Sequence, residues 1–255
     1  MTTSRAKEKA VSGGPRGYFE QSRDLLNSLV LVLPLMLVYQ VGLFLTQGQT
    51  LNGADFVTVA VIRRWGADGL LVLNGLLIAA GIVGVAVLMK RRRFDPKIAA
   101  PMALEATVYA VLLGTIITQV LGRVGVHPPG MVIEDWAPLA SGQVAQAGVM
   151  ARICMALGAG VNEELVFRLG MVPGITALAE RVMARKHALL VAVLLSSLLF
   201  SLAHYLGEPF AVYTFLYRLL AGVIFCGIFA ARGFGVAVYT HAIYDIMVMV
   251  VLARD

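Results

Sequence analysis

Seven long apolar segments constrain the fold of this chain more than any other feature of its sequence. Each holds about 20 mostly apolar residues, which is the length that a helix needs to cross a membrane. The segments are residues 26–46, 69–89, 98–121, 148–171, 188–206, 210–230 and 233–252. Only helices and closed barrels satisfy their backbone hydrogen bonds in lipid, and barrel strands alternate in polarity instead of forming long apolar runs. The sequence therefore predicts an all-α, polytopic transmembrane bundle of about seven helices.

The composition agrees with a membrane protein. Hydrophobic residues make up 59% and charged residues 14% of the 255 residues, whereas a soluble domain has about 45–50% and about 25%. The net charge of +6 is then explained by membrane topology, and no nucleic-acid partner is expected. Cys154 and Cys226 both lie in apolar segments, so no disulfide framework is predicted.

The chain is expected to form one transmembrane domain, residues 25–255, after a polar and basic N-terminal segment, residues 1–24. Residues 56–65 are apolar but short, and they end in Arg63 and Arg64. We interpret them as a helix at the membrane interface, with a shallow eighth span as the alternative.

Basic residues concentrate in alternate connections between the apolar segments, and cytoplasmic loops carry the excess of Lys and Arg. They are Arg5, Lys7, Lys9, Arg16 and Arg23, then Lys90, Arg91, Arg92, Arg93 and Lys97, then Arg181, Arg185 and Lys186, and finally Arg232. This pattern predicts a cytoplasmic N-terminus and a C-terminus on the outer side. The compact size and the usage of arginine, alanine and glycine suggest a bacterial protein of the inner (cytoplasmic) membrane.

Two adjacent glutamates, Glu163 and Glu164, lie inside the fourth apolar segment. A carboxylate in hydrocarbon costs about 2.5–3.5 kcal/mol, so such groups are paired or functional. Glu164 stands four residues before Arg168, which is the spacing of a helical ion pair. Because neighbours on a helix diverge by about 100°, Glu163 is left to act as a general base. In the structural alternative both are paired, one to Arg168 and one to an arginine such as Arg218.

Three further polar side chains lie in later apolar segments. His204 ends the fifth segment, and His241 and Asp245 share one face of the last, four residues apart. A packing histidine and a helix–helix hydrogen bond are the structural alternatives. Polar groups on three separate segments favour a catalytic constellation. His204 is expected nearer the outer surface than Glu163 and His241, so a shared site requires a sunken 206–209 connection or different bounds for the fifth segment.

These residues form three ordered motifs, Glu163-Glu164-x-x-x-Arg168, Phe200-x-x-x-His204 and His241-x-x-x-Asp245. Together they resemble the CPBP family of CAAX proteases and bacteriocin-processing enzymes, also called Abi or Rce1-like intramembrane endopeptidases. The resemblance covers about residues 148–252, the motif-bearing core.

The resemblance implies that Glu163 activates a water molecule, with His204 as its partner on that water. It implies that His241 and Asp245 stabilise the oxyanion, and it assigns supporting positions to Glu164, Arg168 and Phe200. Relatives that process prenylated proteins carry Asn at the last motif position, so the Asp245 carboxyl needs a proton to donate there.

No cofactor is expected. Zinc is the alternative, because His204, His241 and Glu163 with one water would form an ordinary catalytic zinc set. The chain has no His-Glu-x-x-His motif, and the resemblance favours water activated by glutamate without a metal.

We therefore predict an intramembrane endopeptidase that cuts near the C-terminus of lipidated or membrane-anchored substrates within the lipid bilayer. CAAX processing, removal of C-terminal anchors by a sorting peptidase such as a myxosortase, and peptide maturation all stay open. A proton-coupled transporter and a non-catalytic scaffold or immunity protein are the other functional classes. The chain shows no internal repeat of the transporter kind, and it keeps every motif residue, which a scaffold does not need.

Overall fold

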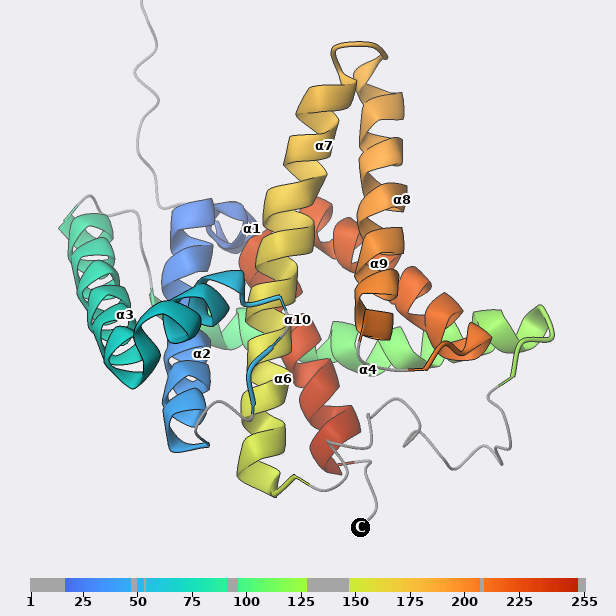
Figure 1. The fold of residues 1–255 in the computed structure, drawn as a ribbon. Coiled ribbons are helices and arrows are strands. Elements are labelled where there is room, and N and C mark those ends of the chain that lie inside the picture. Colours follow the sequence, from blue (N-terminus) through green and yellow to red (C-terminus); the bar gives the residue numbers. More distant parts are fainter. Residues whose placement is uncertain are drawn as a thin grey trace, which may run out of the picture.

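The computed structural model describes residues 17–46, 50–52, 54–90, 96–127, 147–206 and 209–251, in which every regular element is a helix (Figure 1). The N-terminal half contains α1 (Tyr18–Arg23), α2 (Leu25–Leu45), α3 (Phe56–Lys90), the short turn η1 (Pro96–Ile98) and α4 (Ala99–Arg123). The C-terminal half contains α6 (Val149–Glu163), η3 (Glu164–Met171), α7 (Val172–Ala179), α8 (Arg185–Ala203), η4 (His204–Leu206), α9 (Val212–Arg232), α10 (Phe234–Ile246) and η5 (Met247–Val251). The prediction of an all-α bundle is confirmed. Most of the predicted polar N-terminal segment, residues 1–16, lies outside the described residues.

Six helices in the described part of the chain are long and apolar enough to cross a membrane. They are Leu25–Leu45, Phe56–Gly84, Ala99–Arg123, Arg185–Leu206, Val212–Arg232 and Phe234–Val251. The remaining predicted segment, 148–171, forms α6 and η3, which carry four charged residues. This segment is helical as expected, but its charges set it apart from the six.

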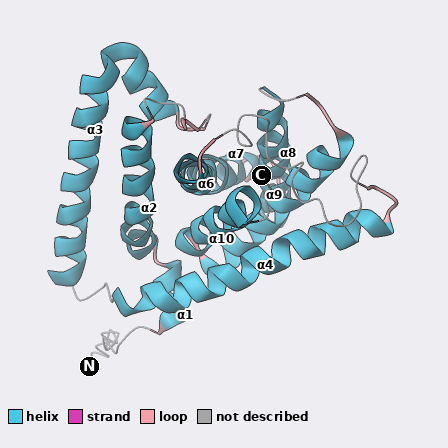
Figure 2. Ribbon diagram, turned by 90° about the horizontal axis from the view of Figure 1, so that it is seen from below, coloured by secondary structure: helices cyan, strands magenta, loops and turns pink. Residues whose placement is uncertain are grey.

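The predicted separation of residues 56–65 from the following span corresponds to a sharp break in α3. Gly66 has φ 58° and ψ −144°, a conformation that glycine adopts far more readily than other residues. The side chain of Asp55 caps the start of this helix by accepting a hydrogen bond from the Thr58 N–H at 3.0 Å. Figure 2 shows α3 turning sharply at the end that follows α2.

Helix α10 lies in the interior of the bundle and packs against α2, α4, α6 and α9. A single residue, Gly233, separates it from α9, and its φ of 91° reverses the chain direction. A Cβ atom at Gly233 would lie 2.9 Å from Cα of Arg23 in α1, so the space also requires glycine. This tight connection fixes where α10, which carries His241, enters the bundle.

Helices α6 and α10 approach each other closely at Gly160. A Cβ atom at this position would lie 2.7 Å from the backbone nitrogen of Ala242. Small residues allow such close contact between helices in membranes. As a result, the end of α6 that carries Glu163 lies directly beside His241.

A polar cluster at the α9–α10 connection ties the N-terminal helices to the C-terminal half. Arg232 Nη2 donates to Glu105 Oε2 at 2.8 Å and to Ser22 Oγ at 3.1 Å, and Tyr109 Oη donates to Glu105 Oε1 at 2.8 Å. Tyr18 also donates to Glu105, and burial together with this carboxylate raises the pKa of Tyr18 to about 12. Its hydroxyl therefore stays protonated and donates at neutral pH. Glu105, which has no place in the three motifs, is held by structural contacts.

Helices α7 and α8 form a hairpin that projects beyond the other helices (Figure 1). Helix α8 begins in this projection and runs toward the other helices. His204, the first residue of η4 at the end of α8, therefore lies close to Glu163 of α6.

Candidate active site

The helix that carries the two glutamates changes its hydrogen-bonding pattern at the motif. The α-helical α6 ends at Glu163, and a π-helical segment, η3, begins at Glu164. A second π-helical segment, η5, begins two residues after Asp245. π-Helical turns are rare and are frequent at functional sites. The sequence analysis treated both segments as regular α-helices and therefore missed these wider turns.

The two oxygens of the Glu163 carboxylate have different surroundings. Oε1 accepts a hydrogen bond from Asn52 Nδ2 at 2.9 Å. Oε2 is buried, has no hydrogen-bond partner among the described residues, and lies 3.9 Å from Nε2 of both His204 and His241. A gap of this size is too long for a direct hydrogen bond, and one water molecule can bridge it with two bonds of about 2.8 Å.

His204 directs its Nε2 atom toward Glu163. Its Nδ1 atom lies 2.9 Å from the carbonyl oxygen of Phe200. Because a carbonyl only accepts, Nδ1 carries a proton, which leaves Nε2 as the nitrogen on the side of the glutamate. The side chain is 26% exposed, compared with 12% for Glu163. The two residues are thus close together, and the fifth segment begins at Arg185, three residues before its predicted start.

The alternative explanation for that mismatch, a sunken 206–209 connection, falls partly on residues 207–208, which lie outside the described residues. His204 lies 3.9 Å from Glu163 through the described residues alone, so this explanation is not required.

His241 connects three carboxyl groups. Its Nδ1 donates to Glu164 Oε1 at 2.8 Å, and its Nε2 lies 3.5 Å from Asp245 Oδ2 and 3.9 Å from Glu163 Oε2. The imidazole stacks on the Phe225 ring with a centroid distance of 4.6 Å and an interplanar angle of 19°. Contacts on both nitrogens and on the ring face hold His241 in one orientation. The i, i+4 spacing therefore places His241 and Asp245 together, as expected.

Glu164, Arg168 and Phe200 form the support behind the two histidines. Arg168 Nη1 lies 3.1 Å from Glu164 Oε1, and both side chains are completely buried. The guanidinium lies 4.2 Å from the centroid of the Phe200 ring, within the range of a cation–π contact. The same ring meets His204 and His241 edge-on, at centroid distances of 5.2 and 6.0 Å. The ion pair predicted from spacing is present, and Glu164 additionally accepts from His241.

The charges in this cluster do not balance without added protons. Glu163, Glu164 and Asp245 supply three carboxyl groups, Arg168 pairs with one of them, and Arg218 of α9 acts electrostatically on Asp245. Two positive charges against three negative ones leave one negative charge, and an unbalanced buried charge is costly. Neutrality therefore requires at least one more proton on an imidazole or on a carboxyl group.

Asn52 is the contact that the sequence analysis missed. It lies in the connection between α2 and α3, far from the three motifs, and its neighbours are ordinary loop residues. No spacing or periodicity relates it to Glu163, so only the tertiary structure reveals the pair.

The zinc alternative would use His204, His241 and Glu163 as ligands. Among the described residues, no group of three or more His, Cys, Asp and Glu side chains is arranged to hold a metal ion. Two atoms bound tetrahedrally to one zinc lie about 3.3 Å apart, since each bond is about 2.0–2.1 Å. The Nε2 atoms of His204 and His241 both lie 3.9 Å from Glu163 Oε2.

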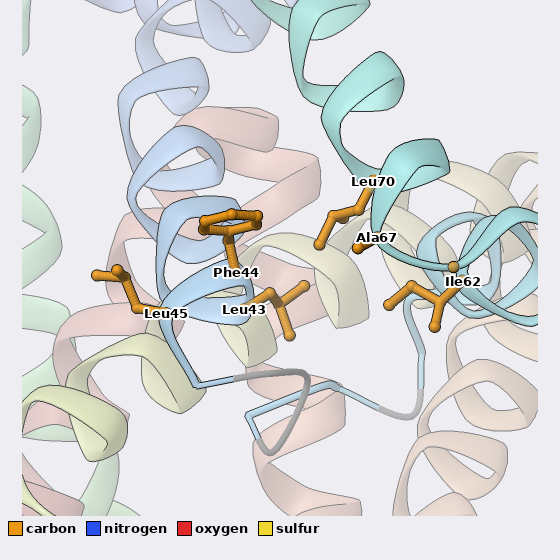
Figure 3. A pocket seen from close by; sticks show the side chains of 7 residues that line it. Leu43, Phe44, Leu45, Ile62, Ala67 and Leu70 are labelled. Carbon is orange, nitrogen blue, oxygen red and sulfur yellow. The ribbon is translucent and has the colours of Figure 1, made fainter.

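An apolar groove of about 570 Å³ lies near this cluster but is separate from it. It is lined by the end of α2 and by the kink of α3, through Leu43, Phe44, Leu45, Ile62, Gly66, Ala67 and Leu70. Figure 3 shows the labelled side chains of α2 on one side of the groove and those of α3 on the other. No polar motif residue lines it, so the candidate active site is the buried cluster and not this groove.

Comparison with known families finds one similarity. Residues 145–247 match the Rce1-like family, described as type II CAAX prenyl endopeptidase Rce1-like. This segment of the chain is similar to that family. The matched segment contains all three motifs and leaves α1–α4 outside it. No curated protein and no solved structure was found to match the chain.

The similarity of residues 145–247 to the Rce1-like family favours a peptidase of the CAAX type. The six helices that are long and apolar enough to cross a membrane agree with an integral membrane protein.

Proposed function

We propose that this protein hydrolyses a peptide bond near the C-terminus of lipidated or membrane-anchored substrates, using water activated by Glu163. One observation carries the proposal. The unpartnered oxygen of a buried carboxylate lies 3.9 Å from two imidazole nitrogens, a distance that one shared water molecule would bridge.

In the proposed reaction, Glu163 Oε2 accepts a proton from this water as the water oxygen attacks the scissile carbonyl carbon. His204 Nε2 holds the same water and orients its attack. Collapse of the tetrahedral intermediate breaks the C–N bond. The proton held by Glu163 then passes to the leaving amine, so that the carboxylate is restored.

His241 and Asp245 are proposed to stabilise the oxyanion. The Nδ1–H of His241 is held by Glu164, so Nε2 faces the reacting centre. In its protonated form this nitrogen donates to a developing negative charge, as does Asp245 when it holds a proton. The charge balance supports this role, because at least one proton must be retained within the cluster.

The arrangement favours hydrolysis over proton transport or a scaffold role. The two histidines converge on a single oxygen of Glu163, whereas a relay needs polar groups that follow one another across the membrane. A scaffold gains nothing from a buried carboxylate oxygen without a hydrogen bond, which costs about 1–3 kcal/mol.

We further propose that the protein lies in a bacterial inner membrane with its N-terminus in the cytoplasm, and that a myxosortase-like trimming of C-terminal anchors is one candidate role. The distribution of basic residues supports this orientation. Labelling of cysteines introduced at Lys90 and at Arg123 with a membrane-impermeant reagent in intact cells tests it. Only the second position should react.

The function is tested with purified protein in proteoliposomes and two reporters, a lipidated C-terminal peptide and a peptide with a transmembrane anchor. Cleavage is followed by mass spectrometry. Glu163→Gln is nearly isosteric and should lower turnover at least about 10²-fold, because it removes the base. Glu180→Gln is the matched control, since Glu180 forms an exposed ion pair with Arg185 at 3.6 Å and is not among the residues of the cluster. Equal turnover by Glu163→Gln and wild type would refute the mechanism.

A further inference from the structure

A residue outside the family segment contacts the proposed catalytic carboxylate. Asn52, in the connection between α2 and α3, donates from Nδ2 to Glu163 Oε1 at 2.9 Å. The partners are 111 residues apart in the sequence. This is the hydrogen bond that makes the two oxygens of Glu163 different from each other.

The amide of Asn52 is held in one orientation by its own loop. Its Oδ1 atom accepts a hydrogen bond from the Ala54 N–H at 2.8 Å. Since only the oxygen of an amide can accept, this contact fixes which atom is Nδ2, and Nδ2 must then face Glu163. The backbone N–H of Asn52 donates to the hydroxyl of Tyr39 at 3.0 Å. These contacts fix the orientation of the Asn52 side chain, so that its Nδ2 atom donates to the Glu163 carboxylate.

Tyr39 connects this loop to the helix that carries Glu163. Its side chain is fully buried, and its ring lies so close to Gly158 of α6 that a Cβ atom there would be 2.4 Å from the ring. Gly158 and Glu163 are on the same helix. The position of Asn52 is thus set, through Tyr39, relative to the helix that carries its partner.

We propose that Asn52 is a positioning residue for Glu163, an inference that rests on the proposed function. By holding Oε1, it stops rotation of the carboxylate and leaves Oε2 facing His204 and His241. A donor to a carboxylate also favours its ionised form, which is the form that acts as a base.

The variant Asn52→Ala should lower kcat by about 10- to 100-fold, because a hydrogen bond to a charged group is lost. KM should stay within about twofold, because Asn52 is not proposed to touch the substrate and its loss should leave substrate binding unchanged. The acidic limb of the pH–rate profile should move to higher pH, because the ionised carboxylate loses a donor. Asn52→Asp should be more severe at neutral pH, since it places a second carboxylate against Glu163.

Tyr39→Phe supplies a second, milder variant. It keeps the buried ring but removes the hydroxyl that holds the Asn52 N–H, so kcat should fall in the same direction by a smaller factor. Asn74→Ala is the matched control, because the Asn74 amide donates to the Leu70 carbonyl of its own helix at 2.8 Å. Its kcat and pH profile should match those of the wild type.

All variants are compared as monodisperse protein in proteoliposomes with the same two reporters. The proposal is supported by a loss of kcat with unchanged KM together with the shifted acidic limb. Folded Asn52→Ala protein with wild-type kcat and pH profile overturns it, as does an equal loss in Asn74→Ala. If the wild type is active and Glu163→Gln is not, either of these two results overturns the role of Asn52 but leaves the proposed function standing. A wild type that cleaves neither reporter overturns both.

Discussion

A double-mutant cycle on Glu163 and His204 tests whether the two residues act on one water molecule. In wild-type protein, Glu163 Oε2 and His204 Nε2 lie 3.9 Å apart, a distance that a single bridging water would span. Removing either group takes away one of the groups that hold this water. Residues that act as a unit in this way give losses that do not add.

The magnitude follows from this geometry. General-base catalysis contributes about 10²–10⁴-fold, so Glu163→Gln and His204→Ala should each lower kcat/KM by at least about 10²-fold. Independent groups would give about 10⁴-fold in the double variant, whereas a shared water gives about 10²-fold. The difference corresponds to a coupling free energy of about 2.7 kcal/mol, since each factor of ten is about 1.4 kcal/mol.

The assay is cleavage of the lipidated reporter in proteoliposomes by the wild type, both single variants and the double variant. His187→Ala is the control for the histidine substitution, because His187 is an exposed residue near the start of the same helix, α8. It should leave kcat/KM unchanged. Losses that multiply fully in the double variant would show that the two groups act independently and would refute the shared water.

Three further outcomes are expected from the same structure. Asp245→Asn should keep substantial activity, because the amide supplies a permanent donor of the same shape, and prolonged chelation by o-phenanthroline should not inhibit; inhibition that added zinc reverses would favour a metallopeptidase. Gly160→Ala should destabilise the protein by about 1–3 kcal/mol, because the added methyl group meets the α10 backbone. Gly174→Ala is the control and should not destabilise it, since nothing lies within 4 Å of the new methyl group. Equal melting temperatures of the two variants would contradict this prediction. Glu105→Gln should cost about 2–3 kcal/mol by leaving the Arg232 guanidinium unpaired, while the folded fraction keeps its kcat; a loss of kcat would link this cluster to catalysis.

The fold class could be predicted from the sequence because hydrocarbon permits so few backbone structures. Apolar length predicted seven segments, and six of them overlap the six helices of the described chain that are long and apolar enough to span a membrane. The short segment 56–65 was recognised by its length and by Arg63 and Arg64. The break at Gly66 agrees with that interpretation. The π-helical segments η3 and η5 could not be predicted, because widening a turn by one residue leaves no mark on an apolar pattern.

The ion pair of Glu164 with Arg168 and the proximity of His241 to Asp245 could be predicted, because both pairs have the i, i+4 spacing that places side chains on one helix face. The bond from His241 to Glu164 could not, since it joins residues 77 positions apart. Its formation depends on how closely two helices approach each other.

The geometry of the site is therefore set by residues that carry no chemistry of their own. Gly233 reverses the chain into α10, and Gly160 lets α10 approach α6, so that His241 reaches Glu163. Gly158 leaves the space that Tyr39 fills, and Tyr39 in turn holds the loop that carries Asn52. The motifs determine which polar groups are buried, whereas these glycines determine the distances between them. Because Tyr39 and Asn52 lie outside the matched family segment, the N-terminal helices contribute directly to the geometry of the site as well as to the bundle.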